Sequence, residues 1–255
     1  IGKYEIRKFL ERDGLGLTYQ GRGLQLECDV AIKEYLPIQL AARQAGLEVE
    51  AYSAQQTENF LFGLDRFLTE ARKLAELAGT PALLEVHDCF EANGTAYVVT
   101  APVWGETLSM LLTRQGNLTT RAIDLLLPPL LDGLEHLHAA GLLHLDITPS
   151  NILLDACGQP TLFDFGQART ALAARGSAIK AFHAAGYAAI EQLSDQQTGP
   201  FTDIHGLAAT LYHCVTGCVP LPAIHRLKAP LPPASELAVG DYPLHLLAAI
   251  DTGLA

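Results

Sequence analysis

The sequence has few basic residues: 17 Lys and Arg stand against 28 Asp and Glu, which gives a net charge of −11. A protein that binds nucleic acid neutralises phosphates with a basic face, so this balance disfavours that class. No apolar run approaches the roughly 20 residues that a membrane span requires, and no signal peptide is visible. We therefore expect no nucleic-acid partner and no membrane contact within this segment.

Cysteine is scarce, and its spacing suggests no metal site or disulfide framework. The five cysteines are odd in number and lack a C-x-x-C motif: Cys28, Cys89, Cys157, Cys214 and Cys218. The last two lie four residues apart, but no matching His/Cys pair follows them, which disfavours zinc. Buried free thiols in a reducing compartment are the better interpretation, and we expect a cytoplasmic protein.

The composition is that of a globular protein, with 49% hydrophobic and 18% charged residues in a chain of 255. This length suits one large domain or a two-lobed unit, and no internal repeat or low-complexity tract stands out. Because the chain begins at Ile1 rather than Met, we expect it to be part of a longer protein.

The first hundred residues predict a small, strand-rich lobe. Apolar runs broken by Gly and charge indicate three strands of an antiparallel meander between Tyr4 and Lys33. Apolar residues at three- and four-residue spacing predict a helix over 58–77. Two further strands follow, over 83–90 and 95–102, joined by a turn at 92–94. The stretch 34–57 is less regular and forms an insert without an assigned function.

The remainder predicts a larger, mainly helical lobe. Helices are expected over 108–114 and 121–140, where Pro128 and Pro129 either kink the second helix or mark its true start. Short strands at 152–154 and 161–163 come next. An irregular Ala-rich stretch over 166–186 and helices from about Asp203 complete the lobe. The fold class is thus α+β and bilobal: lobe 1–100 with one main helix, linker 101–106 and lobe 107–255.

Three fragments suggest a chemistry: A-I-K at 31–33, H-L-D-I-T-P-S-N at 144–151, and D-F-G at 164–166. Each fragment alone is weak evidence for a function, but their order and the secondary-structure elements between them form a specific pattern. Together they resemble the protein-kinase superfamily, and more narrowly the bacterial eukaryotic-like (Hanks-type) serine/threonine kinases. The likeness continues in G-Y-A-A-I-E-Q (186–192) and T-D-I-H-G-L (202–207), so it covers nearly the whole chain.

The resemblance implies a bilobal kinase fold and roles for five groups in phosphoryl transfer. Lys33 would hold the α- and β-phosphates of ATP, steadied by Glu70 from the helix behind it. Glu34 is nearer in sequence, but it points to the opposite side of its strand. Asp146 would orient the acceptor hydroxyl, and Asn151 and Asp164 would be the oxygen ligands of Mg²⁺.

The same resemblance implies a nucleotide-binding set and several structural residues. In the linker, Thr100 would be the gatekeeper, with the Ala101 carbonyl and the Val103 amide contacting the adenine edge. The expected nucleotide-binding residues are Gly14, Gly16, Ala31, Lys33, Thr100, Ala101, Val103 and Leu153. His144 and Phe165 would be packing residues, and Asp203 would cap the backbone of the catalytic loop.

The phosphate-binding loop departs from the family pattern. Gly14 and Gly16 remain, but Glu11 and Asp13 stand where the first two glycines would be. A carboxylate about 6 Å from a phosphate would repel it by roughly 3 kcal/mol at an effective dielectric near 20. Weak nucleotide binding follows if these side chains point inward, which the pattern does not decide.

The catalytic loop departs as well. Leu145 replaces the Arg that meets a phosphorylated loop residue, so phosphorylation at Thr170 or Ser177 is not expected to act through that route. Thr148, counted with the catalytic residues, replaces a Lys, and Ala184 replaces the Thr that bonds to that Lys. Losing both partners leaves no orphaned donor, but it removes a charge-stabilising contact worth about 10²- to 10³-fold in rate.

These observations predict an ATP- and Mg²⁺-dependent protein kinase that phosphorylates Ser or Thr of protein substrates, with low activity. One alternative is a pseudokinase, a binding or scaffold module. Another is a small-molecule phosphotransferase, which D-F-G and G-Y-A-A-I-E-Q disfavour. Partner domains or a cognate phosphatase fit the resemblance. The chain stops at Ala255 before the family's Arg partner of Glu191, so an incomplete carboxyl end is expected.

Overall fold

The computed structural model describes residues 1–255 except 45, 103, 177–183 and 195. The chain divides into two compact units. The first comprises Ile1–Gly79, Leu84–Val103 and Gly166–Phe182, and the second comprises Thr80–Leu83, Trp104–Phe165 and His183–Ala255. Residues 80–83 thus group with the second unit and 166–182 with the first, while the lobe boundaries given above remain a prediction.

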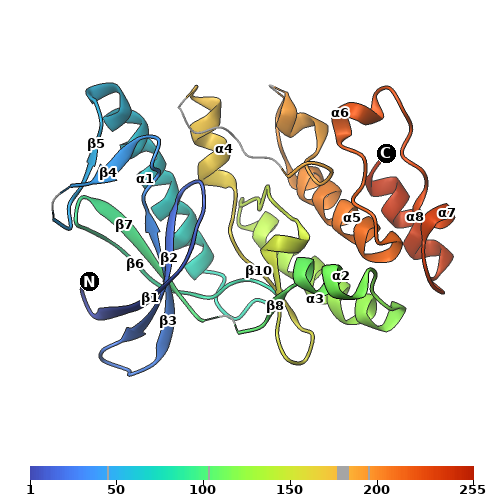
Figure 1. Ribbon diagram of the computed structural model, residues 1–255, viewed down its shortest axis with the longest axis horizontal. Helices are drawn as coiled ribbons and strands as arrows, with labels where there is room; N and C mark the ends of the chain where they lie inside the picture. The colour runs from blue at the N-terminus through green and yellow to red at the C-terminus, as the bar shows by residue number, and fades with distance from the viewer. Residues whose placement is uncertain (45, 103, 177–183, 195) are drawn as a thin grey trace. The chain divides into compact units, whose positions relative to one another are not determined.

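An antiparallel five-stranded sheet dominates the first unit, in the order β1-β2-β3-β7-β6 (Figure 1). Its strands are β1 (Tyr4–Arg12), β2 (Gly16–Gly23), β3 (Asp29–Tyr35), β6 (Val86–Ala92) and β7 (Thr95–Thr100). The predicted meander and hairpin are therefore confirmed. Asn93 and Gly94 turn the second hairpin with φ of 52° and 69°, the left-handed geometry that a two-residue hairpin loop requires.

One face of this sheet carries a small apolar core. Alternating residues of β3 and β7 point into it, and Tyr4 stacks on Phe90 with ring centroids 6.0 Å apart. The buried members are Tyr4, Val30, Ile32, Tyr97 and Val99. The other face of β3 meets helix α1 (Ala54–Ala75), because Tyr35 packs on Phe60 and Phe67 with ring centroids 5.1 and 5.5 Å away.

Helix α1 begins four residues before the predicted start at 58. Ser53 has extended backbone, and its hydroxyl accepts from the Gln56 N–H at 3.3 Å, which is the bonding that a helix N-cap provides. The predicted face, from Phe60 to Leu74, is buried. The first turns thus come from the stretch that the sequence pattern had assigned to the insert.

The insert after Lys33 is more regular than predicted. Strands β4 (Ala41–Arg43) and β5 (Val49–Ala51) pair antiparallel as a short hairpin. The hairpin contacts the β6–β7 turn, where the Val49 N–H donates to the Asn93 carbonyl at 2.8 Å. A Cβ on Gly94 would lie 2.6 Å from the Val49 oxygen, so the turn glycine also permits this contact.

The expectation of an irregular stretch over 166–186 is wrong for its first part. Residues Gln167–Ala174 form helix α4, which packs on α1 within the first unit. A Cβ on Gly63 of α1 would lie 2.6 Å from Leu172 Cδ1. The close packing of these two helices supplies the stabilisation that the short, Ala-rich sequence of α4 does not indicate by periodicity.

The second unit is mainly helical, as predicted. Its helices are α2 (Leu108–Gln115), α3 (Thr120–Ala139), α5 (Pro200–Thr216), α6 (Ala223–Arg226), α7 (Ala234–Leu237) and α8 (Leu244–Gly253). A three-stranded sheet joins β8 (Glu106–Thr107), β9 (Ile152–Leu154) and β10 (Pro160–Leu162) in the order β10-β9-β8. The described residues of this unit also form two 3₁₀ turns, Pro149–Asn151 and Ile190–Leu193. The α+β fold class is confirmed.

Helix α3 contains both prolines in its interior, so they do not mark its start. It begins after Thr119, whose hydroxyl accepts from the Ala122 N–H at 3.3 Å. Helix α5 is buried over most of its circumference, from Thr202 to Thr216, and forms the centre of the unit. Across the parts of the chain that the structure describes, no helix combines the length and apolarity needed to span a bilayer.

Candidate active site

Lys33 lies in the middle of β3, paired across the sheet with Thr18 of β2 and Val98 of β7. Its side chain points to the same face as Tyr35, two residues on, and that face is the one covered by α1. Glu70 is half-buried on α1, three residues after Phe67 and therefore on the contact face. The architecture of the first unit is thus compatible with the predicted roles of Lys33 and Glu70.

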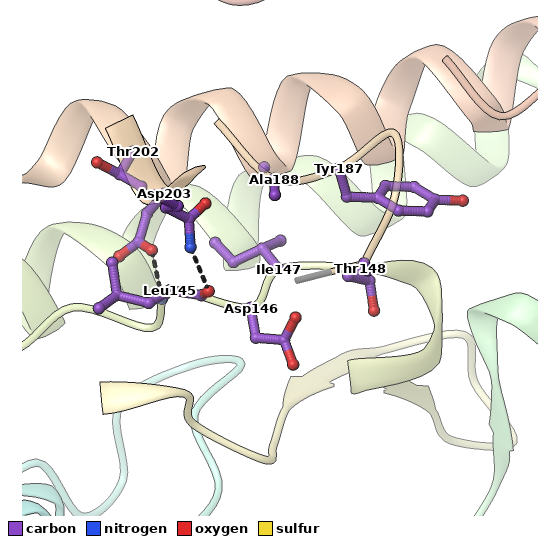
Figure 2. A pocket seen from close by; sticks show the side chains of 11 residues that line it. Leu145, Asp146, Ile147, Thr148, Tyr187, Ala188, Thr202 and Asp203 are labelled. Carbon is purple, nitrogen blue, oxygen red and sulfur yellow. Dashed lines mark hydrogen bonds between the residues drawn. The ribbon is translucent and has the colours of Figure 1, made fainter. Parts of the chain in front are cut away.

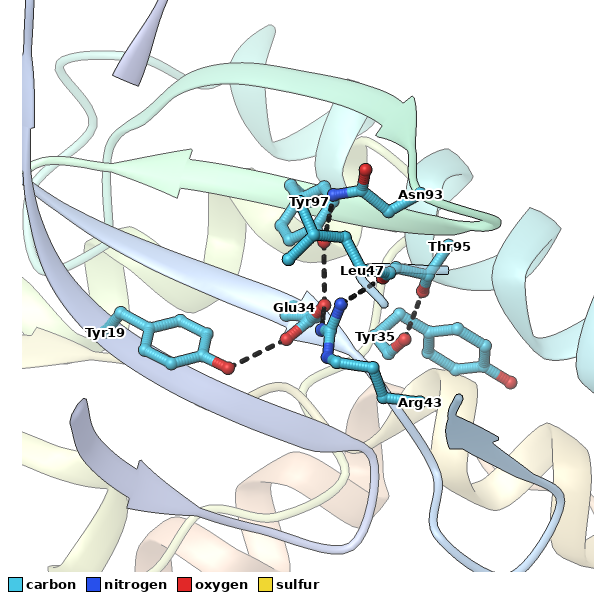
Figure 3. A network of polar contacts seen from close by, with 8 residues as sticks. All are labelled: Tyr19, Glu34, Tyr35, Arg43, Leu47, Asn93, Thr95 and Tyr97. Carbon is cyan, nitrogen blue, oxygen red and sulfur yellow. Dashed lines mark hydrogen bonds and ion pairs between the residues drawn. The ribbon is translucent and has the colours of Figure 1, made fainter. Parts of the chain in front are cut away.

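Glu34 belongs to a separate polar network on the opposite face (Figure 3). Its carboxylate accepts hydrogen bonds from the hydroxyls of Tyr19 at 2.8 Å and Tyr97 at 2.7 Å, and it pairs with Arg43 of the insert hairpin. The side chain of Glu34 is 1% exposed. Burial and the Glu34 carboxylate raise the pKa of Tyr19 far above its usual value of 10.0. The prediction that Glu34 faces away from Lys33 is therefore confirmed.

The loop between β1 and β2 has two glycines with different surroundings. A Cβ on Gly16 would lie 1.8 Å from the Glu34 carbonyl oxygen, so close approach of β3 requires glycine there. Gly14 is exposed. The Asp13 carboxylate lies 2.6 Å from the Lys33 ammonium, whereas Glu11 is exposed. Of the two acidic replacements, Asp13 thus points inward.

Three of the residues expected to contact adenine, Ala31, Thr100 and Ala101, lie on or directly after the neighbouring strands β3 and β7. Ala31 and Thr100 are cross-strand partners in β3 and β7, and the buried Thr100 hydroxyl donates to the Ala101 carbonyl at 3.2 Å. The Ala101 N–H donates to the Glu85 carbonyl at 2.9 Å. Val103 lies outside the described residues. Leu153 lies on β9 of the second unit, and the adenine contacts of this set remain predictions.

The catalytic loop of the second unit is held by Asp203, as predicted (Figure 2). The buried Asp203 carboxylate accepts from the backbone N–H of His144 at 2.8 Å and of Leu145 at 2.7 Å, and it lies 2.8 Å from His138 Nε2. Leu145 has a φ of 61°, a costly conformation for a non-glycine residue. The Asp203 bonds stabilise this strained turn.

Gln192 is a support that the sequence reasoning missed. Its Nε2 donates to the Leu145 carbonyl at 2.8 Å, and its Oε1 accepts from the Ala189 N–H at 3.0 Å. Leu145, which stands where the family carries Arg, is therefore fixed through both of its peptide groups. The signal in the sequence was the G-Y-A-A-I-E-Q segment, whose final Gln had no assigned role.

Asp146 and Asn151 are joined through the backbone. Asn151 Nδ2 donates to the Asp146 carbonyl at 2.8 Å, which leaves the Asn151 amide oxygen as the group for a ligand. The Asn151 carbonyl in turn accepts from the Phe163 N–H at 3.1 Å. Asp164 follows with a φ of 59°. The chain thus brings Asp146, Asn151 and Asp164 together by bonds between the two loops.

His144 is a packing residue, as predicted. It is fully buried, its ring lies 4.5 Å from that of Phe165 between centroids, and its Nε2 lies 3.2 Å from the Phe163 carbonyl. Burial lowers the pKa of His144 below 6.5, although the carboxylates of Asp203, Asp146 and Asp164 act in the opposite direction. A neutral His144 is therefore a structural link between the loop 144–151 and the D-F-G segment.

A small cavity of about 10 Å³ is lined by Asp146, Thr148 and Ala184, among others. This volume accommodates about one water molecule. Thr148 is 5% exposed. The two residues that replace the family's Lys and Thr thus line the same space, which supports treating them as one paired change.

The donor set fits Mg²⁺. The Asn151 amide oxygen and the Asp164 carboxylate are hard oxygen ligands of the kind that Mg²⁺ prefers, and Mg²⁺ typically takes one or two protein ligands beside phosphate oxygens. Their positions as metal ligands remain a prediction.

Glu191 has a partner within the described chain. Its Oε1 accepts from the Thr202 hydroxyl at 2.7 Å, so its buried carboxylate is bonded to the start of α5. Arg226, which the sequence reasoning had not singled out, donates to the carbonyls of Gly186 and Leu254, both at 3.2 Å. These contacts anchor the 186–192 segment from the carboxyl-terminal side.

Comparison with known proteins shows similarity to protein kinases, in agreement with the arrangement of these residues. A model of the protein kinase domain matches residues 45–230. The chain is 31% identical over 249 residues to the serine/threonine-protein kinase PknL of Mycobacterium bovis, covering 94% of this chain and 58% of PknL. It is 30% identical over 268 residues to PknD of Mycobacterium tuberculosis, covering 100% of this chain and 37% of PknD.

A third curated relative is PknA of Mycobacterium tuberculosis, at 32% identity over 246 residues, 91% of this chain and 52% of PknA. The chain thus spans roughly half the length of these relatives, or less. Among solved structures, "PpkA-294 apo form" is similar with a TM-score of 0.87 and 35% identity, covering 99% of this chain and 90% of that chain.

Proposed function

Because the chain belongs to the protein kinase family, in the bacterial Hanks-type serine/threonine group, we propose that it transfers the γ-phosphoryl group of ATP to Ser or Thr of protein substrates. The observation that supports this most is the retention of all five groups that the reaction needs, on elements suited to their roles. Lys33 lies on the strand face covered by α1, and Asp146 lies in a loop held by Asp203.

The proposed role of Asp146 is to orient the acceptor hydroxyl and to take its proton. Its backbone carbonyl is bound by Asn151 Nδ2 at 2.8 Å, and the N–H of the preceding Leu145 is bound by Asp203 at 2.7 Å. A side chain carried on such a fixed backbone loses little freedom when the substrate arrives. This support is what a catalytic carboxylate requires.

Lys33 would neutralise phosphate charge, with Glu70 holding the ammonium in position. Asn151 and Asp164 would hold Mg²⁺, which when bound offsets the negative charge of the phosphates. Thr148 is a hydroxyl where the related kinases carry an ammonium, so the proposed reaction lacks one cationic contact with the transferring group. We accordingly expect slow turnover.

We further propose a cytoplasmic setting, where ATP is available, and protein substrates as partners. Partner domains outside this segment and a phosphatase that reverses the reaction are compatible with the family.

The test is transfer of labelled phosphate from ATP and Mg²⁺ to the protein itself and to a generic acceptor protein. Asp146→Asn should lower the rate by about 10²- to 10⁴-fold and leave folding intact. The matched control is Asp124→Asn, which removes the same charge from an exposed position on α3 and should change the rate less than twofold. Equal rates in wild type and Asp146→Asn would contradict the proposal.

A pseudokinase is the second candidate, because the inward-pointing Asp13 lies 2.6 Å from Lys33. The same assay separates the two: a protein that binds nucleotide but transfers no label above the Asp146→Asn background would be a binding module.

A further inference from the structure

Asp13 is bound as an anion by the loop that carries it. Its Oδ1 accepts from the backbone N–H of Leu15 at 2.6 Å and of Gly16 at 2.8 Å. Its Oδ2 lies 2.6 Å from the Lys33 ammonium. Two converging backbone N–H groups and an ammonium are the ligands that protein loops offer to phosphate.

The arrangement is largely shielded from solvent and is internally closed. The side chains of Asp13 and Lys33 are 18% and 21% exposed, and Leu15 is buried at 2%. The Asp13 N–H also donates to the Gly16 carbonyl at 3.1 Å, so Asp13 closes the turn from both its backbone and its side chain. The loop is thus ordered around a carboxylate that is part of the chain.

We propose that Asp13 is an internal occupant of the phosphate site, which nucleotide must displace before its phosphates reach Lys33 and the loop amides. This inference rests on the proposed function, since it assumes that Lys33 holds phosphates. Each loop N–H group has one hydrogen, which the Asp13 carboxylate already occupies, so the Leu15 and Gly16 amides cannot bind a phosphate until Asp13 leaves. The Lys33 ammonium must likewise exchange its Asp13 contact for one to phosphate. A phosphate entering beside the carboxylate would instead meet like-charge repulsion.

The consequence is a specific loss of affinity for the phosphates of nucleotide rather than for the nucleoside. The free energy of the Asp13 contacts is lost whenever phosphates bind. Adenosine has no phosphates, so its binding leaves the contacts of Asp13 with Lys33 and the loop amides in place. The ratio of ATP affinity to adenosine affinity is therefore the quantity that Asp13 controls.

Two variants and one control separate this effect from a general change of charge. Asp13→Gly removes the occupant, and Asp13→Asn keeps an acceptor for the N–H groups while removing the negative charge. Glu50→Gln removes an equal charge from an exposed position on β5 in the same unit. Calorimetric titration with Mg²⁺–ATP and with adenosine gives the dissociation constants for all four proteins.

We expect Asp13→Gly to bind Mg²⁺–ATP about 10- to 100-fold more tightly than wild type, with adenosine affinity changed less than twofold. The ATP affinity of Asp13→Asn should lie between those of wild type and Asp13→Gly, and that of Glu50→Gln should stay within about threefold of wild type. In hydrogen exchange without ligand, the Leu15 and Gly16 amides should lose protection in Asp13→Gly.

Unchanged or weaker ATP binding in Asp13→Gly, with measurable binding by wild type, would overturn the inference and leave the proposed function standing. An equal gain for adenosine and ATP would also overturn it, because the effect would then not act through the phosphates. If no variant binds ATP, both the inference and the proposed function fail.

Discussion

Arg43 of the insert hairpin pairs with the buried carboxylate of Glu34, nine residues earlier in the chain and on the face of β3 opposite Lys33. The insert is thereby joined to the strand that carries the proposed phosphate-binding lysine. Arg43 also donates to the Leu47 carbonyl within the hairpin, so it holds the hairpin together as well as fastening it to the sheet.

Removing Arg43 should leave a buried charge without its cation. We expect Arg43→Met to lower the free energy of unfolding by about 2–4 kcal/mol, because breaking a buried pair exposes the desolvation cost of the remaining partner. Urea denaturation measures the loss. Arg7→Met, which breaks an exposed pair with Glu5 at 3.0 Å, is the control and should cost less than about 1 kcal/mol. Equal losses of unfolding free energy in the two variants would mean that the buried Arg43–Glu34 pair stabilises the fold no more than the exposed pair does.

Asp203→Asn should disturb the catalytic loop more than the nucleotide site. The His144 and Leu145 N–H groups are bound by different oxygens of the Asp203 carboxylate, and the asparagine amide replaces one of these acceptors by an NH2 donor that faces an N–H group. We expect a loss of about 2–3 kcal/mol in unfolding free energy and a lower kcat with little change in KM for ATP. Asp132→Asn, exposed on α3, is the control. A change confined to KM would contradict this role.

Restoring the missing cation should speed transfer. Thr148→Lys alone should raise kcat by about 10-fold, and Thr148→Lys with Ala184→Thr by about 10²-fold, because the added hydroxyl fixes the ammonium near Asp146. Steady-state kinetics of the two single variants and the double variant give the coupling. Additive effects, or no gain in the double variant, would show that the two positions do not act together.

Stability should fall with acidification below about pH 6.5. Burial lowers the pKa of His144, His205 and His213 below their usual 6.5 in the folded chain. The unfolded chain therefore binds protons first as the pH falls, and the native state loses up to about 1.4 kcal/mol per pH unit for each histidine. Urea denaturation at pH 7.5, 6.5 and 5.5 measures the slope. His213→Gln should reduce it, and a stability independent of pH over this range would contradict the prediction.

The contact between α1 and α4 depends on Gly63. A Cβ there would lie 2.2 Å from the Tyr35 hydroxyl oxygen and 2.6 Å from Leu172 Cδ1. We expect Gly63→Ala to destabilise the fold by about 1–3 kcal/mol through overpacking, although alanine favours helix by about 1 kcal/mol. Asp65→Ala, exposed on α1, is the control and should be neutral in urea denaturation. If Gly63→Ala raised the free energy of unfolding instead, α1 and α4 would have moved apart to accept the added methyl group at little cost.

The sequence predicted those elements whose local pattern and final packing agree. The meander, the Asn93–Gly94 hairpin and the buried face of α1 follow from period and turn chemistry. The role of Asp203 followed from the resemblance, and its bonds confirm it. In these places each local preference supports the tertiary structure.

Other features depend on contacts distant in sequence, which no local pattern reveals. The insert hairpin has strands of three residues held by Arg43 against Glu34, and α4 is stabilised by packing on Gly63 rather than by its own periodicity. The direction of Asp13 was undecidable from the loop sequence, because it is set by two backbone N–H groups and Lys33. Such long-range contacts override propensity.

Helix α4 has a consequence for chemical modification of the chain. Thr170 lies in its first half, with its N–H bonded to the Gly166 carbonyl at 2.9 Å. Another enzyme can bind a hydroxyl in a helical turn only after that turn has unfolded locally. Local unfolding has a free-energy cost. The rate at which another enzyme modifies the Thr170 hydroxyl would therefore report how often this part of α4 unwinds.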